Sequence, residues 1–236
     1  MRYAKRSAGI CTARQNHSPE RVNLRKAYDM NPDYTLYLCT DSALMSANSV
    51  EDCVERAVRG GVSVVQLREK RAASRELYEL AKRVKRVTDA YGVPLIINDR
   101  VDICMAVDAS GVHLGQKDLP CREARKLLGR GKLIGVSAAL PEEALRAQED
   151  GADYLGVGAV FSTATKEDTR PVTRETIAAI RRAVTLPFVV IGGVNAKNIT
   201  QLYGLGINGA AVVSAIVAQP DITAAARVMR AAAERL

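Results

Sequence analysis

Two carboxylates that follow apolar runs are the first residues in this chain whose spacing could do chemistry. Asp99 comes just after LIIN (95–98), and Asp118 comes shortly after GVHLG (111–115). If both runs are parallel strands joined by one helix, they end at the same rim, and both carboxylates project into the same space. Two acids at such a rim suggest a divalent cation, although either acid alone is typical of a helix cap or a turn.

Cationic side chains are expected at the same rim. QLREK (66–70) places Gln66, Arg68 and Lys70 at alternating positions, so they point to one side of a strand. Lys166 stands in a long loop after a later strand-like run. Arg supplies a hydrogen-bonding fork and Lys a point charge, and Mg²⁺ binds through one or two carboxylates plus phosphate oxygens. The set therefore favours a metal-bound pyrophosphate, although a lone R-x-K also occurs at solvated strand ends.

A second anion site is indicated near the end of the chain. Gly193, within IGGV (191–194), allows backbone N–H groups to approach an anion closely. Ser214, within VVSAI (212–216), is expected at the start of a helix, where N–H groups attract negative charge. A plain turn is the alternative for the two glycines. Two anion sites on one rim imply two phosphorylated substrates or one bisphosphate.

Two further polar residues have less reactive interpretations. His113 lies in the middle of an apolar run and is expected to be a hydrogen-bonded core or supporting histidine. Ser137 follows another apolar run without a neighbouring His or acid that could activate it, so it is interpreted as a hydrogen-bond donor.

These residues need a scaffold that brings many strand ends together. Eight short apolar runs follow one another and lack strict polar alternation, as in parallel strands covered by helices. They are 34–39, 62–67, 94–98, 111–115, 132–137, 153–158, 187–192 and 209–214. Helical periodicity appears between them at 50–60, 75–92, 141–151 and 174–184. The pattern predicts an α/β fold with a single (β/α)₈ barrel over residues 33–236, with a doubly wound sheet as the alternative.

Charge is concentrated before the barrel. The chain has 236 residues and a net charge of +8, and residues 1–32 alone contain seven basic and two acidic residues. The body has two Phe and no Trp and most of the excess positive charge lies before it, so a nucleic-acid surface is not expected there. Residues 1–32 are interpreted as a basic N-terminal extension that is a flexible arm, a partly helical lid or a targeting segment.

The remaining composition bears on the cellular compartment. Five cysteines are scattered without a C-x-x-C pair, which indicates buried thiols and not a disulfide framework or structural zinc. No run of 18 apolar residues suggests a membrane span, and the N-terminus lacks the apolar segment of a secretory signal. We therefore expect a cytoplasmic protein that binds small molecules and neither membrane nor nucleic acid.

Taken together, the motifs resemble the thiamine phosphate synthase family. QLREK, INDR, GVHLGQKD, GVS, STATK, VIGGV and VSAI stand in the family's order and spacing, over about residues 33–232. The resemblance implies a TIM barrel that joins a hydroxymethylpyrimidine pyrophosphate to a thiazole phosphate and releases pyrophosphate with Mg²⁺ as cofactor. It implies small phosphorylated substrates as partners and leaves a homo-oligomer open.

The resemblance also assigns roles to particular residues. The implied ligands of the pyrimidine pyrophosphate are Gln66, Leu67, Arg68, Glu69, Lys70, Asn98, Ser137 and Lys166. The implied ligands of the thiazole phosphate are Thr163, Ala164, Thr165, Gly193, Val213 and Ser214. Asp99 and Asp118 would bind Mg²⁺, and Arg68, Lys70 and Lys166 would be catalytic.

The sequence departs from the family pattern at a few positions and leaves two alternatives open. The departures are Lys117, Ala139, Leu140, Ala159, Ser162 and Ala164. A thiazole tautomerase of the same fold would not need the pyrophosphate-binding cations and acids, which argues against it. A non-catalytic sensor of a phosphorylated ligand, with the basic arm binding a partner, would differ from an enzyme in lacking Mg²⁺-dependent turnover.

Overall fold

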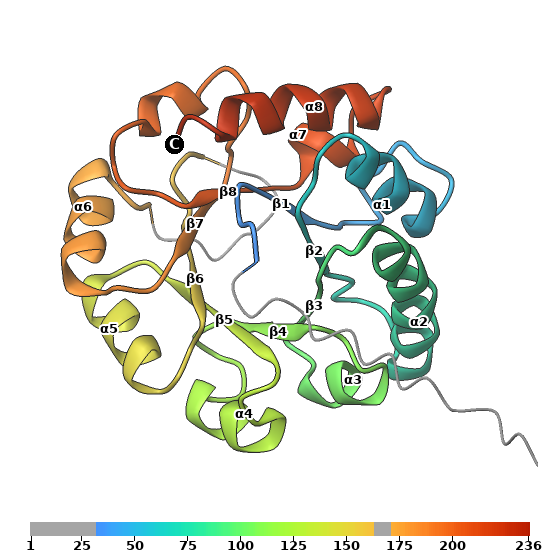
Figure 1. Cartoon of the computed structure of the whole chain (residues 1–236), viewed down its shortest axis with the longest axis horizontal. Helices are drawn as coiled ribbons and strands as arrows, with labels where there is room; N and C mark the ends of the chain where they lie inside the picture. Colours follow the sequence, from blue (N-terminus) through green and yellow to red (C-terminus); the bar gives the residue numbers. More distant parts are fainter. Residues whose placement is uncertain (1–31, 163–170) are drawn as a thin grey trace, which may run out of the picture.

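Eight parallel strands close into a barrel in the computed structural model, which describes residues 32–162 and 171–236 (Figure 1). The strands are β1 (Leu36–Cys39), β2 (Val64–Leu67), β3 (Leu95–Asn98), β4 (Gly111–Leu114), β5 (Leu133–Ala138), β6 (Tyr154–Gly158), β7 (Phe188–Ile191) and β8 (Gly209–Val212). Each pairs with the next, and β1 pairs with β8. The predicted (β/α)₈ barrel is confirmed, and the doubly wound sheet is excluded.

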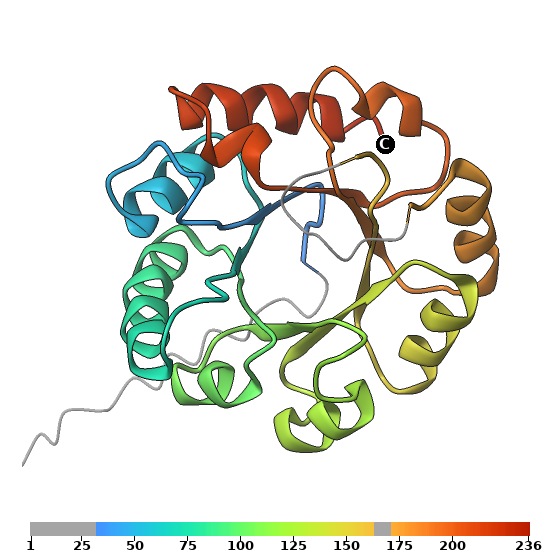
Figure 2. The ribbon, with the colours of Figure 1, turned by 180° about the vertical axis from the view of Figure 1, so that it is seen from behind.

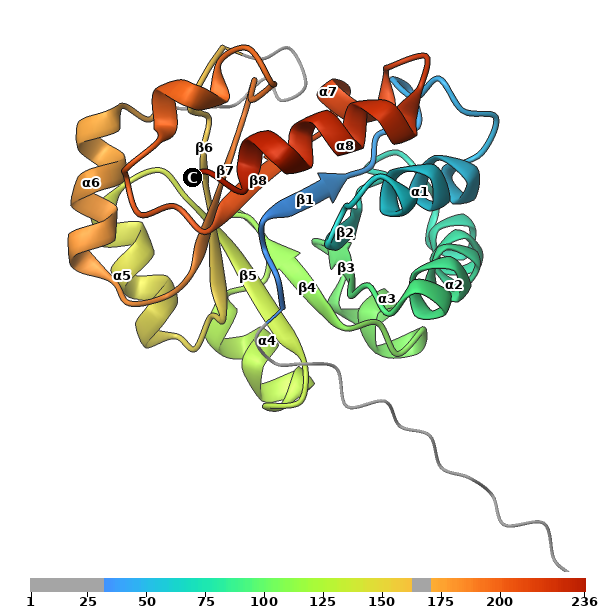
Figure 3. The same cartoon turned by 45° about the horizontal axis from the view of Figure 1, so that its top comes forward.

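The helices surround the strands, and the view from behind shows the same outer ring (Figure 2). They are α1 (Val50–Arg59), α2 (Ser74–Tyr91), α3 (Val101–Ala106), α4 (Cys121–Leu128), α5 (Pro141–Glu149), α6 (Arg174–Ala183), the 3₁₀ helix η1 (Ile199–Leu202), α7 (Ser214–Val217) and α8 (Ile222–Ala233). The four stretches with clear helical periodicity correspond to α1, α2, α5 and α6. Tilting the molecule shows α8 along the outside of the barrel beside β1, with α7 next to it (Figure 3).

Local sequence signals set the helix boundaries. Ser49, Thr173 and Asp221 each cap a helix by accepting a hydrogen bond from a backbone N–H in its first turn. Gly92 ends α2 in the left-handed conformation that glycine adopts without strain. These caps fix where α1, α6 and α8 begin and where α2 ends.

The core has two layers. The larger one lies between strands and helices and contains side chains such as Leu38, Val65 and Ile97. The smaller one fills the barrel interior and includes Tyr37, Tyr154 and Cys39. Alternate residues of each strand therefore face the helices or the barrel axis. The axis-facing set decides what can line a cavity at the rim.

Two further predictions concern a membrane span and the N-terminal extension. No helix among the described residues is long and apolar enough to cross a membrane. Residues 1–31 lie outside the described part of the chain, so the basic N-terminal extension stays a prediction. The same holds for the cytoplasmic location.

Candidate active site

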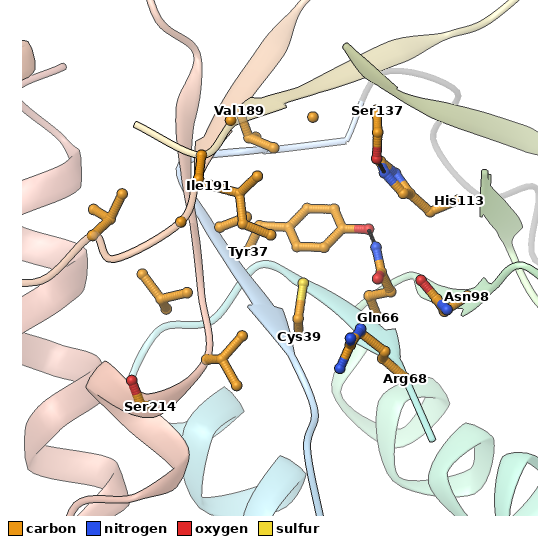
Figure 4. Close-up of a pocket in the computed structure, with 18 of the residues that line it drawn as sticks. Tyr37, Cys39, Gln66, Arg68, Asn98, His113, Ser137, Val189, Ile191 and Ser214 are labelled. Atoms are coloured by element: carbon orange, nitrogen blue, oxygen red, sulfur yellow. Dashed lines mark hydrogen bonds between the residues drawn. The ribbon is translucent and has the colours of Figure 1, made fainter. Parts of the chain in front are cut away.

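A cavity of about 440 Å³ opens where the strands end, and residues of all eight strands or of the loops after them line it (Figure 4). This is the end of the barrel at which (β/α)₈ enzymes place their chemistry. Most of the residues singled out from the sequence line this cavity: Gln66, Arg68, Lys70, Asn98, Asp99, His113, Asp118, Ser137, Gly193, Val213 and Ser214. The parallel barrel has brought together residues from positions 66 to 214.

Asp99 and Asp118 form the predicted carboxylate pair. Burial, followed by the proximity of the Asp118 carboxylate, raises the pKa of Asp99, while Lys70 opposes the shift. The Lys70 ammonium lies 3.4 Å from a carboxylate oxygen of Asp99. The Asp118 carboxylate accepts a hydrogen bond of 2.7 Å from the N–H of Gly115. Asp99 and Asp118 therefore lie together at this end of the cavity, with the Lys70 ammonium beside Asp99.

The backbone at Asp99 supports this placement. Asp99 has a φ of 62°, a left-handed conformation that Asp and Asn adopt more readily than most residues. Its N–H still donates to the carbonyl of His113 at 2.9 Å, which continues the pairing of β3 with β4. The strand thus ends in a sharp turn that directs the carboxylate to the rim.

The donor set suits a divalent cation that takes few protein ligands. In residues 32–162 and 171–236, no group of three or more His, Cys, Asp or Glu side chains could hold a metal ion. Zinc sites usually use three or four such side chains. Mg²⁺ instead binds through one or two carboxylates, with phosphate oxygens and water completing its shell. Asp99 and Asp118 are two neighbouring carboxylates that repel each other, and they therefore fit a Mg²⁺ ion that also binds a phosphorylated ligand.

The alternating residues after β2 supply positive charge. Gln66, Arg68 and Lys70 all line the cavity, as their spacing predicts. Arg68 is held from two sides. Its backbone N–H donates to the Thr40 hydroxyl at 3.0 Å, and its guanidinium lies 3.6 Å from the Asp41 carboxylate. The segment just after β1 thus fixes the Arg68 backbone through Thr40 and orients its guanidinium through Asp41.

The side chains of the two intervening residues, Leu67 and Glu69, lie outside the cavity. Leu67 is fully buried in the outer core, facing the helices. The Glu69 carboxylate accepts hydrogen bonds from the hydroxyls of Thr40 at 3.0 Å and Ser42 at 2.6 Å. Neither side chain lines the cavity, because odd-numbered residues here point away from the barrel axis. Any contact of Leu67 or Glu69 with a ligand would use backbone atoms.

Across the cavity, a glycine turn follows β7. Gly192 and Gly193 have φ values of 99° and 66°. The Gly193 carbonyl accepts hydrogen bonds from the side-chain amides of Asn195 at 3.2 Å and Asn198 at 2.9 Å. A Cβ on Gly193 would lie 2.5 Å from the Ser162 carbonyl oxygen, so only glycine fits. Sequence reasoning missed both asparagines, whose signal is their position just after the glycines.

Ser214 begins α7, as predicted, but α7 is a single turn of four residues. A macrodipole grows with helix length, so its contribution here is small. Any attraction for an anion would instead come from the first N–H groups of this turn and from the serine hydroxyl. Four predicted site residues, Thr163, Ala164, Thr165 and Lys166, lie outside the described residues.

A closed parallel barrel with a carboxylate pair, rim cations and a glycine turn after β7 defines a (β/α)₈ barrel of the kind that binds phosphorylated small molecules. Residues 36–216 match the model of the family described as thiamine monophosphate synthase. The chain belongs to this family, whose members are transferases that form thiamine phosphate.

Individual relatives support the assignment to this family. The thiamine-phosphate synthase of Ruminiclostridium cellulolyticum is 56% identical over 82% of this chain and 92% of its own length. That of Syntrophomonas wolfei is 51% identical over 87% of this chain and 99% of its own. The structure of thiamine phosphate pyrophosphorylase from Pyrococcus furiosus superposes with a TM-score of 0.79 and 37% identity, over 86% of this chain and 96% of that one. These comparisons support the synthase and not the tautomerase or the sensor.

Proposed function

We propose that this barrel joins an aminopyrimidine methyl pyrophosphate to a thiazole phosphate, with loss of pyrophosphate assisted by Mg²⁺. One observation carries the proposal: a single cavity has acids and cations at the ends of β2, β3 and β4, and a glycine turn and a serine at the ends of β7 and β8. It therefore offers two separate places for phosphate groups, as two phosphorylated substrates require.

The pyrophosphate is assigned to the charged side. The Arg68 guanidinium and the Lys70 ammonium would bind its oxygens and stabilise the negative charge that develops as it leaves. Asp99 and Asp118 would hold Mg²⁺, which when bound would neutralise further charge on the leaving group. Lys166, from the resemblance to the family, is proposed to add a third cation.

The pyrimidine ring is assigned to the polar floor formed by Gln66, Asn98 and Ser137. Nothing described in the cavity is an activated nucleophile. Cys39 lines it, but burial raises the pKa of this thiol to about 12, so it stays protonated and unreactive. We propose that the C–O bond to pyrophosphate breaks first and leaves a methylene cation on the electron-rich pyrimidine. The thiazole nitrogen then supplies the electron pair for the new C–N bond and needs no base.

The thiazole phosphate is assigned to Gly193, Val213 and Ser214, with Thr163, Ala164 and Thr165 as further proposed contacts. Replacing Ser214 by Ala removes one hydrogen bond to a non-reacting phosphate. The KM for the thiazole phosphate is therefore expected to rise about tenfold, with the KM for the pyrimidine pyrophosphate nearly unchanged. Steady-state kinetics with each substrate varied in turn measures both.

Ser46→Ala is the matched control for this prediction. The Ser46 hydroxyl donates to the carbonyl of Gln219 at 2.6 Å, next to α7, and does not line the cavity. Both KM values should stay near those of the parent protein. Equal increases for both substrates in Ser214→Ala would show that the two phosphate sites are misassigned. Gly193→Ala is a poorer probe, because its Cβ would collide with the neighbouring loop.

The direct test of the proposed function is the release of pyrophosphate when both substrates are mixed with the protein, with and without Mg²⁺. Pyrophosphate formed together with thiamine phosphate supports it, and failure to form either product refutes it.

A further inference from the structure

A chain of hydrogen bonds crosses the floor of the cavity from Gln66 to Ser137. The Gln66 amide Nε2 donates to the Tyr37 hydroxyl at 2.9 Å, and the hydroxyls of Tyr37 and Tyr154 are 2.8 Å apart. The Tyr154 hydroxyl is 3.2 Å from Nδ1 of His113, whose Nε2 is 3.0 Å from the Ser137 hydroxyl. Figure 4 shows the links at both ends of this hydrogen-bond chain.

Packing holds the middle members in one arrangement. Tyr37 and Tyr154 are fully buried, and His113 is 9% exposed. A Cβ on Gly135 would lie 2.1 Å from the Tyr154 ring and 2.5 Å from Nδ1 of His113, so a glycine in β5 makes room for both rings. Since these side chains have little freedom to move, what remains to be set is the position of each proton along the chain.

The proton positions follow from the first link. Burial raises the pKa of Tyr37 and Tyr154 well above the usual value, so each hydroxyl keeps one proton to donate. An amide NH₂ only donates, so the Tyr37 oxygen accepts from Gln66. In the described part of the chain, Tyr154 is the other hydrogen-bond partner of the Tyr37 hydroxyl, and it receives the Tyr37 proton.

The remaining links are then fixed in turn. Tyr154 donates to Nδ1 of His113, which leaves the imidazole proton on Nε2. Nε2 donates to the Ser137 oxygen, and the Ser137 proton is available to a ligand in the cavity. At the other end, Gln66 has its carbonyl oxygen, an acceptor, available to the ligand. To make Gln66 a donor and Ser137 an acceptor toward the ligand, the Gln66 amide would have to flip. Every hydrogen bond along the chain would then have to change direction.

We infer that this hydrogen-bond chain makes Gln66 an acceptor and Ser137 a donor toward the substrate ring, and that Tyr37, Tyr154 and His113 are positioning residues that select an aminopyrimidine over its oxo counterpart. The inference rests on the proposed function. An aminopyrimidine offers an amino donor and ring-nitrogen acceptors, which match the two ends. In the same orientation, an oxo counterpart would turn its carbonyl oxygen toward the Gln66 acceptor and its ring N–H toward the Ser137 donor, which would leave these buried groups unpaired.

The test is Tyr154→Phe, which removes the central hydroxyl and preserves the ring. Calorimetry with Mg²⁺, and without the thiazole phosphate, gives the Kd of the aminopyrimidine pyrophosphate and of its 4-oxo analogue. We expect the preference of the parent protein for the amino compound to fall about tenfold or more in the variant, because the two ends are no longer coupled. The Kd of inorganic pyrophosphate, which would contact only the charged side, should not change.

Tyr34→Phe is the matched control. Tyr34 packs against Tyr154 with ring centroids 4.9 Å apart in the same buried cluster, but is not a member of the hydrogen-bond chain. The Tyr34→Phe variant should prefer the amino compound over the 4-oxo analogue as strongly as the parent protein does. Equal losses of affinity for both pyrimidines in Tyr154→Phe, with the preference unchanged, would overturn this inference and would not affect the proposed function. Binding of neither pyrimidine by the parent protein would overturn the proposed function.

A spectroscopic measurement tests the proton order without any substrate. The sequence has two histidines, His17 and His113, so the ¹⁵N signals of His113 can be assigned by replacing His17. At a pH where imidazole is neutral, His113 should carry its proton on Nε2 in the parent protein, and both tautomers should appear in Tyr154→Phe. A proton on Nδ1 in the parent protein would overturn the inference.

Discussion

Replacing Asp99 or Asp118 by Asn is expected to lower turnover at least about tenfold while leaving the barrel folded. Each change would remove one of the two anionic side chains that we propose as ligands of a hard cation. The size is preserved, and an amide can still accept the hydrogen bond that the Gly115 N–H gives to Asp118. Turnover measured against Mg²⁺ concentration should show a weaker response in both variants.

Asp108→Asn provides a control for the unusual backbone of Asp99. Asp108 also has a positive φ, 54°, but its side chain is 82% exposed and pairs with Lys132 away from the cavity. Asn tolerates this conformation, so neither substitution should strain the turn. Asp108→Asn should keep the turnover of the parent protein. Unchanged Mg²⁺ dependence in both cavity variants would contradict the metal assignment.

Stability distinguishes a lost ligand from a damaged fold. The pKa of Asp99 is raised above its usual 3.8, so its ionised form costs stability in the metal-free folded protein. Below about pH 3.8 both folded and unfolded states hold the proton, and that cost disappears. Asp99→Asn should therefore unfold at higher denaturant concentration than the parent protein near pH 7, and the difference should shrink as the pH falls.

The second large effect concerns the order of bond breaking. An electron-withdrawing group on the pyrimidine is expected to slow the chemical step by about two orders of magnitude, because it destabilises a methylene cation on the ring. Single-turnover measurements isolate this step from product release. A substituent effect near zero would instead favour direct displacement by the thiazole nitrogen. The hypothesis of an early C–O cleavage would then have to be dropped.

Much of the scaffold was predictable because it depends on patterns along the chain. The apolar runs became the eight strands, since parallel strands buried on both faces need continuous apolar side chains. Parallel pairing then placed Asp99, Asp118 and Arg68 at one rim. The alternation of Gln66, Arg68 and Lys70 also follows from strand geometry, and the same rule shows why the side chains of Leu67 and Glu69 face away.

Other parts of the site depend on contacts between distant strands. Tyr37 and Tyr154 are separated by 117 positions, and each lies in an apolar run that looks like ordinary core. Their hydrogen bond arises only when the barrel closes. The amides of Asn195 and Asn198 likewise find the Gly193 carbonyl because of the local turn. A sequence pattern identifies which residues are buried but not which hydroxyl meets which acceptor.

The most direct measurement of the central claim uses the full chain with both substrates. Pyrophosphate and thiamine phosphate are quantified together after mixing the aminopyrimidine pyrophosphate, the thiazole phosphate and Mg²⁺ with the protein. We predict that the two products form in equal amounts, that omitting either substrate prevents formation of thiamine phosphate, and that removing Mg²⁺ with a chelator stops the reaction. Absence of thiamine phosphate, or an equal rate after Mg²⁺ removal, would contradict the account.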